Sequence, residues 1–257
     1  RYRHVTGVQT CALPIFQMAC RGTLRSLLIY GGPGTGKTYT IMNVIKDEGF
    51  KSGKDYVKIS GKATAVSIYQ TLFMYRNDGM IIFDDCDSMW GNQDATNILK
   101  AALDTSKVRE ISWSSNNTIN VAKMDDDARD ALFMELDDKL ENSPEERIKL
   151  PNQFEFTGRI IFISNLAREE FDSAIMSRSA KIDMSMTAED ILKRMRSILP
   201  TLGGDDVSVE KKEELLDHLI KMNKEGDLET VTMREFVKSM NILRSGVENW
   251  RDLIRYA

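Results

Sequence analysis

The sequence predicts an α/β fold in which a parallel β-sheet core is followed by a smaller all-helical domain. Up to about residue 186, short apolar runs alternate with amphipathic stretches, a pattern typical of a parallel sheet covered by helices. From Thr187 onward the apolar residues keep helical spacing only. We therefore expect an α/β core over residues 17–186 and a helical lid domain over residues 187–257.

Five apolar runs predict the strands of the sheet. The first, Leu27–Tyr30, has four consecutive apolar residues, as expected of a short buried strand. The other strands are expected at 56–60, 80–83, 159–164 and 180–186.

Helices are expected where apolar residues recur at intervals of three and four. In the core these are the end of a helix before a turn at Gly22 and the stretches 41–45, 65–75, 94–104 and 169–177. Thr187 and Asp190 fit a capping box, which opens a helix that should end at Leu199. Further helices are expected over 207–224, 230–244 and 247–256.

The segment 114–152 is the most individual part of the chain. Strand-like arms at 108–113 and 153–156 flank it and predict a hairpin-like insertion. Within it, residues 126–140 read as an acidic amphipathic helix, with aspartates at the start where the helix dipole favours them. Our hypothesis is that this insertion projects from the core and engages a partner.

The composition excludes several classes of protein. The 257 residues carry a formal net charge of −4, which argues against a large nucleic-acid footprint. Cys20 and Cys86 form no ligand-like or disulfide-like pattern, which favours a reducing cytoplasm. No apolar run approaches the roughly 18 residues that span a membrane. Histidine-based catalysis is disfavoured because His218 is the one histidine outside the first 16 residues.

The residues after the first strand carry the clearest chemical signal. Gly31–Thr38 matches G-x-x-x-x-G-K-[ST] between a strand and a helix, as a phosphate-binding loop requires. Glycines allow backbone N–H groups to close around phosphate oxygens, and the helix N-terminus adds partial positive charge. Lys37 can reach the β- and γ-phosphates, and Thr38 can ligate Mg²⁺. The expected nucleotide contacts are Gly31, Gly32, Pro33, Gly34, Thr35, Gly36, Lys37, Thr38 and Tyr39.

An acidic pair follows the third apolar run. Asp84 and Asp85 come directly after Met80–Phe83, so they should lie at the carboxyl edge of the sheet, where ligands bind in open α/β folds. We expect Asp84 to hold Mg²⁺, through water, and Asp85 to orient or deprotonate the attacking water. ATP and Mg²⁺ are the expected cofactors.

These motifs together resemble those of AAA+ ATPases, and the resemblance covers Leu27 to about Arg244. It implies that Asn165 is the sensor 1 residue facing the γ-phosphate, and that Arg178 is an arginine finger for a neighbouring subunit. It also implies that Arg234 is sensor 2 in the lid, with Arg168 a second choice for the trans-acting arginine. The family usually has Asp-Glu where this chain has Asp84-Asp85, which puts the rate of hydrolysis in question. A homo-oligomeric ring is implied.

We interpret the N-terminal residues as foreign to the natural protein. Residues 5–15, VTGVQTCALPI, resemble the in-frame translation of a sequencing adapter. We therefore exclude residues 1–16 from fold reasoning, as one excludes a fusion scar, and expect the native chain to begin near Gln17. Residues that hold the adenine base are then expected upstream of the first strand.

The motifs disfavour two other classes of nucleotide-binding protein. A GTPase should carry Asn-Lys-x-Asp, and the nearest string, at 223–226, lacks the final acid. A small-molecule kinase shares the phosphate loop but has no need for Asn165, Arg178 and a helical lid together. The loop 61–64 has no aromatic residue, which family members that thread polypeptide usually carry there, although Lys62 could meet a phosphate backbone or an acidic partner.

We therefore predict an ATP-hydrolysing module that couples the nucleotide cycle to remodelling of a protein or nucleic-acid partner, in the cytoplasm and without a membrane. The sequence around the acidic pair and Asn165 resembles AAA-type ATPases of tailed bacteriophages, so the cytoplasm would be that of the host. Two alternatives stay open. One is a nucleotide-dependent assembly scaffold or switch with little hydrolysis, and the other is a clamp-loader-like DNA replication ATPase.

Overall fold

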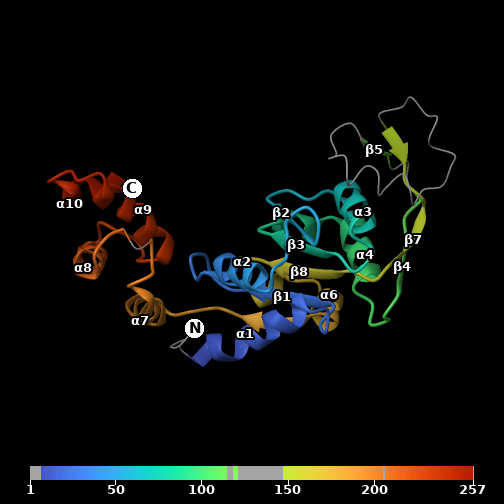
Figure 1. Ribbon diagram of the computed structural model, residues 1–257, viewed down its shortest axis with the longest axis horizontal. Helices are drawn as coiled ribbons and strands as arrows, with labels where there is room; N and C mark the ends of the chain where they lie inside the picture. The colour runs from blue at the N-terminus through green and yellow to red at the C-terminus, as the bar shows by residue number, and fades with distance from the viewer. Residues whose placement is uncertain (1–6, 115–117, 121–146, 205, 257) are drawn as a thin grey trace.

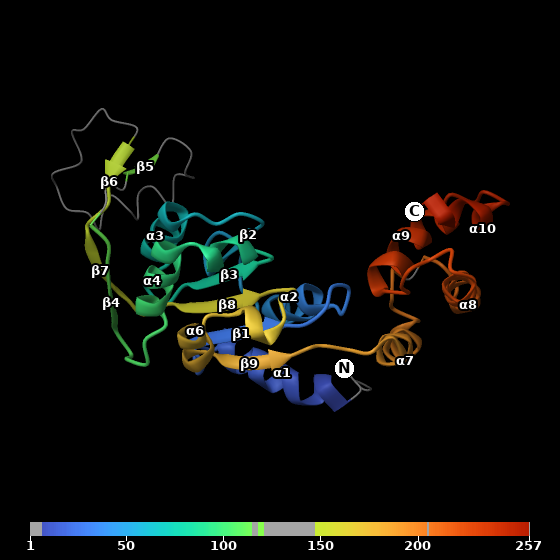
Figure 2. The ribbon, with the colours of Figure 1, turned by 180° about the vertical axis from the view of Figure 1, so that it is seen from behind.

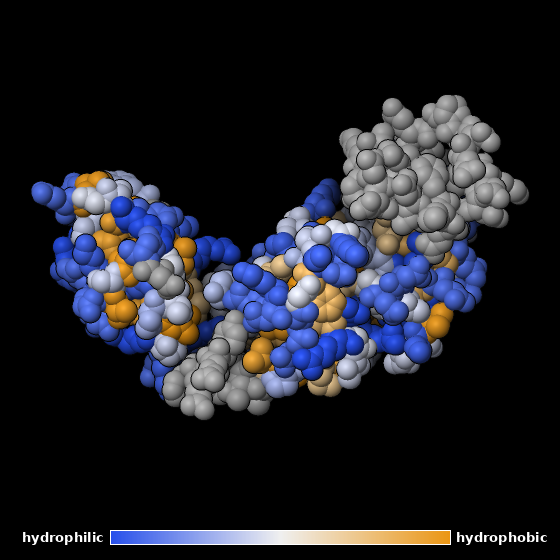
Figure 3. Space-filling view, viewed as in Figure 1, coloured by the Kyte–Doolittle hydropathy of each residue, from blue (hydrophilic) through white to orange (hydrophobic). Residues whose placement is uncertain are grey.

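The computed structural model describes residues 7–114, 118–120, 147–204 and 206–256. The molecule is elongated: an α/β core lies at one end and a group of helices at the other, joined by the chain that leaves the sheet (Figure 1). The view from behind shows the same separation (Figure 2). The space-filling surface is hollowed between these two parts (Figure 3).

The core is a five-stranded sheet with the order β2-β3-β8-β1-β9, and every neighbouring pair is parallel. The strands are β1 (Ser26–Tyr30), β2 (Tyr56–Ser60), β3 (Met80–Asp84), β8 (Arg159–Ile163) and β9 (Ala180–Asp183). The predicted parallel α/β fold is therefore confirmed. β9 ends three residues earlier than predicted.

Helices cover both faces of the sheet because its strands are apolar on both faces. Leu27 and Ile29 pack toward α1 (Gly7–Cys20) and α2 (Lys37–Asp47). Leu28 and Tyr30 pack in the opposite cluster, which contains residues of the helices α3 (Ala65–Met74), α4 (Gln93–Ala102) and α6 (Ser173–Arg178). This alternation is the period-2 pattern of a strand buried on both sides.

Helix α1 begins well before Gln17. It includes Pro14, and Ala12 and Phe16 are buried in the cluster shared with α2. An apolar segment can pack as a helix whatever its origin, so the interpretation of residues 1–16 as a translated adapter stays a prediction.

The predicted arms of the insertion pair as expected. β4 (Arg109–Ser112) and β7 (Gln153–Phe156) form an antiparallel ribbon, and η1 (Asp87–Gly91) and α4 lead into it. Further out, β5 (Thr118–Asn120) pairs with β6 (Arg147–Lys149). The sequence pattern misses these two strands because three residues are too few to show alternation. The predicted acidic helix at 126–140 lies outside the described residues.

The single helix predicted over 169–177 is wrong. The structure has a 3₁₀ turn, η3 (Arg168–Glu170), and then α6. The break comes at Asp172, whose carboxylate accepts the N–H groups of Ala174 and Ile175 at 2.8 and 3.3 Å. An aspartate that caps a new helix in this way ends the preceding turn.

The second part of the chain is helical, as predicted. It contains α7 (Ala188–Ile198), α8 (Val209–Glu225), α9 (Met233–Arg244), α10 (Trp250–Leu253) and η4 (Ile254–Tyr256). The Thr187 hydroxyl accepts the Asp190 N–H at 3.1 Å and the Asp190 carboxylate accepts the Thr187 N–H at 3.2 Å, so the capping box is confirmed. These helices share a separate apolar cluster that starts at Met195, and we therefore propose a domain boundary near residue 186. None of the described helices has the length and apolar character needed to cross a membrane.

Candidate nucleotide-binding site

The phosphate loop connects β1 to α2. Gly31 has φ 138° and Gly36, which precedes α2, has φ 83°, two conformations that favour glycine. A Cβ at Gly31 would lie 2.6 Å from the backbone nitrogen of Ser185, so the neighbouring chain leaves no space for a side chain. Because Gly36 has no side chain to cap α2, the first N–H groups of this helix are available to an anion.

Lys37 is held inside this loop. It is 5% exposed, and its Nζ donates to the carbonyl oxygens of Gly31 and Gly32 at 2.7 and 2.8 Å. A third bond runs to Oδ1 of Asn165 at 2.8 Å. Burial lowers the pKa of Lys37, while the nearby carboxylates of Asp85 and Asp84 act to raise it. The result is a fixed positive charge at the centre of the loop.

Thr38 and Asp84, the two residues that we expect to bind Mg²⁺, are in direct contact. The Thr38 hydroxyl donates to Oδ1 of Asp84 at 2.8 Å, from the first turn of α2 to the end of β3. The other carboxylate oxygen, Oδ2, accepts from Nζ of Lys58 on the adjacent strand β2 at 3.1 Å. Sequence reasoning did not identify Lys58, and its one signal was a lone cation within the strand YVKIS.

Asp85 stands beside this pair in an unusual backbone conformation. Its φ is 54°, in the left-handed region that a non-glycine residue seldom adopts, and its N–H donates to the Ile163 carbonyl at 2.9 Å. Its Oδ1 accepts from Nδ2 of Asn165 at 2.7 Å. Partial burial raises the pKa of Asp85, as do the charges of Asp84 and Asp87. The turn therefore brings the carboxylate of Asp85 to the amide of Asn165.

Asn165 joins the two halves of the site. It follows β8, lies between Lys37 and Asp85, and bonds to both through its two amide atoms. The predicted position of Asn165 at a strand tip near the phosphate loop is therefore what the structure shows.

The lid also reaches the site. Arg234, in the first turn of α9, is close enough to Lys37 and Asp85 for its charge to lower the pKa of both, a smaller effect than that of burial. From α7, Nη1 of Arg194 donates to the Thr35 carbonyl at 2.8 Å. No sequence pattern marks Arg194, because a lone arginine on an amphipathic helix is typical of a solvated surface position. The side chain of Tyr39 is 70% exposed beside the loop.

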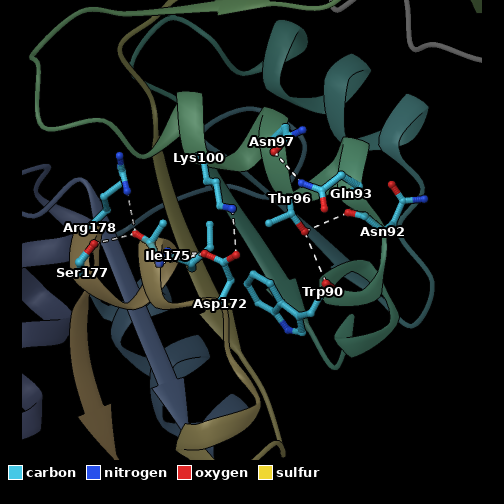
Figure 4. Close-up of polar contacts among 11 residues, drawn as sticks. Trp90, Asn92, Gln93, Thr96, Asn97, Lys100, Asp172, Ile175, Ser177 and Arg178 are labelled. Carbon is cyan, nitrogen blue, oxygen red and sulfur yellow. Dashed lines mark hydrogen bonds and ion pairs between the residues drawn. The ribbon is translucent and has the colours of Figure 1, made fainter.

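Arg178 lies elsewhere. It ends α6, is exposed, and donates to the Ala174 carbonyl of its own helix at 3.1 Å (Figure 4). It comes two residues before β9 begins, whereas the phosphate loop follows the end of β1, which runs parallel to β9. The loop thus lies at the carboxyl ends of the parallel strands, and Arg178 lies near their amino ends. The second candidate, Arg168, borders a different surface recess together with Phe171.

The site fits a nucleoside triphosphate with Mg²⁺. Lys37 and the free N–H groups of α2 match the charge of phosphates, and the oxygens of Thr38 and Asp84 are the hard donors that Mg²⁺ prefers. Within the described part of the chain, no group of three or more His, Cys, Asp or Glu side chains could hold a metal by itself. A Mg²⁺ ion here would therefore share its coordination with phosphate and water oxygens.

Known proteins similar to this chain include a phage protein and several solved structures. A curated relative from Enterobacteria phage T4, an uncharacterized 36.7 kDa protein in the nrdC-mobD intergenic region, is 29% identical over 192 residues, which are 69% of this chain and 50% of that protein. The chain thus spans about half the length of this relative.

Solved structures similar to this chain include AAA domains. The FIGL-1 AAA domain is 13% identical with a TM-score of 0.47, over 95% of this chain and 72% of that one. The same domain in complex with ADP is 14% identical with a TM-score of 0.45, over 98% and 75%. A DNA replication initiation factor is 15% identical with a TM-score of 0.46, over 94% and 62%.

The family model described as "ATPase family associated with various cellular activities (AAA)" matches residues 27–187, which include the phosphate loop, the acidic pair, Asn165 and Arg178. This match covers more than half of the chain. The chain therefore belongs to the AAA family of ATPases.

Proposed function

We propose that this chain binds ATP with Mg²⁺, hydrolyses it, and couples the cycle to remodelling of a macromolecular partner. The observation that carries the proposal is the line of contacts Lys37–Asn165–Asp85 beside the Thr38–Asp84 pair. A phosphate-binding cation, a metal-binding pair and a base are the groups that phosphoryl transfer to water requires.

Each of these side chains has a role that follows from its contacts. When bound, ATP supplies the phosphoryl group and Mg²⁺ offsets its negative charge. Thr38 and Asp84 would hold the metal, and Lys58 limits the repulsion between the two neighbouring aspartates. Asp85 accepts the proton of the attacking water at its carboxylate.

Asn165 and the two arginines complete the proposed mechanism. Asn165 fixes the carboxylate of Asp85 relative to Nζ of Lys37. Arg234 offers charge from the lid. Arg178 acts on the site of a neighbouring subunit, because it lies at the opposite edge of its own sheet.

Nucleotide binding is tested by comparing Lys37→Ala with Lys46→Ala. Both lysines are on α2, but Lys46 is exposed in its last turn. Titration calorimetry with Mg²⁺ and a non-hydrolysable ATP analogue should show affinity reduced about 100-fold or more in Lys37→Ala, since a charged bond to phosphate is lost. Lys46→Ala should bind as the wild type does. Equal affinity in all three proteins would refute the assigned site.

A second candidate function is a nucleotide-dependent scaffold with little hydrolysis. Asp85 favours it, because its carboxylate is one methylene closer to the backbone than that of the glutamate usual in the family. Sedimentation velocity with ATP, ADP and no nucleotide, run beside phosphate release, separates the two functions. A scaffold would assemble with ATP and stay assembled without releasing phosphate.

The partner would be engaged by the insertion at 114–152, and we place the protein in the cytoplasm, that of a host cell if the chain is phage-encoded. Deleting residues 116–150 tests this role of the insertion. Loss of partner-stimulated phosphate release with the basal rate intact would support it, and unchanged stimulation would refute it. Single- and double-stranded DNA are the first partners to add, because DNA stimulation would favour the clamp-loader alternative.

A further inference from the structure

Arg194 connects the lid to the phosphate loop. It is 3% exposed, although it lies on the first helix of the lid. Its Nη1 donates to the Thr35 carbonyl at 2.8 Å and its Nη2 to the Thr40 hydroxyl oxygen at 3.5 Å. The Thr40 hydroxyl in turn donates to the Gly36 carbonyl at 2.8 Å. One guanidinium thus contacts the end of the loop and the first turn of α2.

The start of α9 contacts the same loop. A Cβ at Gly34 would lie 2.9 Å from Cβ of Thr232, the N-cap residue of α9. A Cβ at Gly36 would lie 3.6 Å from Sδ of Met233 and 3.5 Å from Nη2 of Arg194. Arg234 follows Met233 directly, so these contacts hold the first turn of α9, which carries Arg234, beside the loop.

We propose that Arg194 is a positioning residue that holds the lid against the phosphate loop, so that the loop and Arg234 respond together to the nucleotide. The inference rests on the proposed nucleotide binding and adds a residue to it. Arg194 contacts the loop through a carbonyl, whereas phosphates are bound by the N–H groups of such a loop.

The chemistry of the peptide group gives this contact a direct effect on the loop. The Thr35 carbonyl and the Gly36 N–H belong to one peptide unit. A charged donor on the carbonyl polarises that unit and makes its N–H a stronger donor, since hydrogen bonds in series strengthen one another. Removing the guanidinium should therefore weaken phosphate binding as well as loosen the lid.

An arginine suits this position better than a lysine or an apolar residue. Its planar fork places donors on two separate nitrogens at fixed positions, so it reaches the Thr35 carbonyl and the Thr40 hydroxyl together, whereas a lysine has to direct all its donors from a single nitrogen. Burial lowers the pKa of Arg194, and burying a cation opposes folding. An apolar side chain of similar length would fill the space without that cost, which favours a role beyond packing.

The test compares four proteins: wild type, Arg194→Met, Arg194→Lys and Arg196→Met. Arg196 is the matched control, because it lies on the same helix, is exposed and pairs with Asp217 of α8 at 2.9 Å. Two quantities are measured: the Kd for ADP, and the protection that ADP gives to the amides of residues 31–38 and 232–236 in hydrogen exchange. Neither measurement depends on hydrolysis.

We expect Arg194→Met to bind ADP about tenfold more weakly, the size of one lost hydrogen bond to a charged group. ADP at saturation should still protect residues 31–38 but no longer residues 232–236. Arg194→Lys should fall between this variant and the wild type, and Arg196→Met should match the wild type.

Unchanged affinity together with unchanged protection of 232–236 in Arg194→Met would overturn the inference while leaving the proposed function intact. If Arg194→Met fails to fold, the same comparison is made with Arg194→Lys, where wild-type values for both quantities would overturn it. Absence of ADP binding by the wild type would overturn the proposed function and this inference together.

Discussion

At the scale of single residues, Asn165 is the point where the site is joined. Its amide oxygen accepts from Lys37 and its amide nitrogen donates to Asp85, so it links the ammonium group of Lys37 to the carboxylate of Asp85. An amide makes both bonds because its oxygen accepts and its nitrogen donates, whereas a carboxylate there would repel Asp85. The order of the motifs predicts that Asn165 lies near the loop. Its hydrogen bonds to Lys37 and Asp85 are visible only in the structure.

We predict that Asn165→Ala lowers kcat roughly 10- to 100-fold, since the base loses its orientation. Nucleotide affinity should change little, because Lys37 keeps its bonds to two loop carbonyls. The control is Asn97→Ala: Asn97 is an exposed residue of α4 that bonds to Gln93 (Figure 4). Steady-state kinetics give both quantities, and a larger change in KM than in kcat would contradict the assignment.

A second prediction concerns Gly31. Gly31→Ala should destabilise the fold by about 1–3 kcal/mol and abolish nucleotide binding, because its Cβ would meet the backbone at Ser185 2.6 Å away and its φ is 138°. Gly32→Ala is the control, since no atom outside residues 31–33 lies within 4 Å of its Cβ position. Urea denaturation measures the difference. Equal stability of the two variants would show that the backbone near Ser185 shifts to make room for the added methyl group.

At the scale of elements, α4 and α6 are fastened together. Nζ of Lys100 on α4 lies 2.8 Å from Oδ2 of Asp172, the residue that caps α6 (Figure 4). Arg178 ends the same short helix, so this ion pair lies at the opposite end of the helix that carries Arg178. The hydrogen bond from Lys100 lowers the pKa of Asp172.

This pair predicts a pH-dependent contribution to stability. Because the pKa of Asp172 is lowered, the contribution is present above the ordinary value of about 3.9 and is lost as the pH falls through the lowered pKa. Lys100→Met should therefore be less stable than wild type at pH 7, by at most about 1 kcal/mol for a pair that is partly exposed. Thermal unfolding should show the two proteins converging in acid. A gap that stays constant would indicate lost packing rather than lost charge.

The elements also show what sequence patterns can predict. Three of the five sheet strands, β1, β3 and β8, are predictable because each is a short apolar run with a sharp polar end. The break within residues 169–177 is not predictable from the spacing of apolar residues. It depends on the Asp172 carboxylate, which caps a new helix at that point. Lys58 and Arg194 act on residues from other elements, and no spacing along one strand or helix reveals a contact of that kind.

At the scale of the whole molecule, Arg178 and the phosphate loop lie at opposite edges of one sheet, and the lid arginines lie near the loop. The described part of the chain thus has the candidate nucleotide site at the carboxyl ends of the strands and the exposed Arg178 at their amino ends. The family resemblance predicts that Arg178 acts away from the phosphate loop of its own chain. The parallel register of β1 and β9 gives it a geometric basis.

We predict that two inactive variants recover activity when mixed. Lys37→Ala keeps Arg178 but lacks a working loop, and Arg178→Ala keeps the loop but lacks the arginine. In a random equal mixture, a working loop meets a neighbour's Arg178 at roughly one site in four, so about a quarter of the wild-type rate should return. If mixing restores nothing while the variants co-assemble, Arg178 does not act between subunits.

The central claim is that Asp85, held by Asn165, drives hydrolysis at this site. The most direct test is the steady-state release of phosphate from ATP with Mg²⁺ by wild type and by Asp85→Ala, at equal nucleotide saturation. The claim predicts a wild-type rate at least about 100-fold above that of the variant, as for loss of a general base. A wild-type rate no faster than that of Asp85→Ala would contradict it and favour the scaffold.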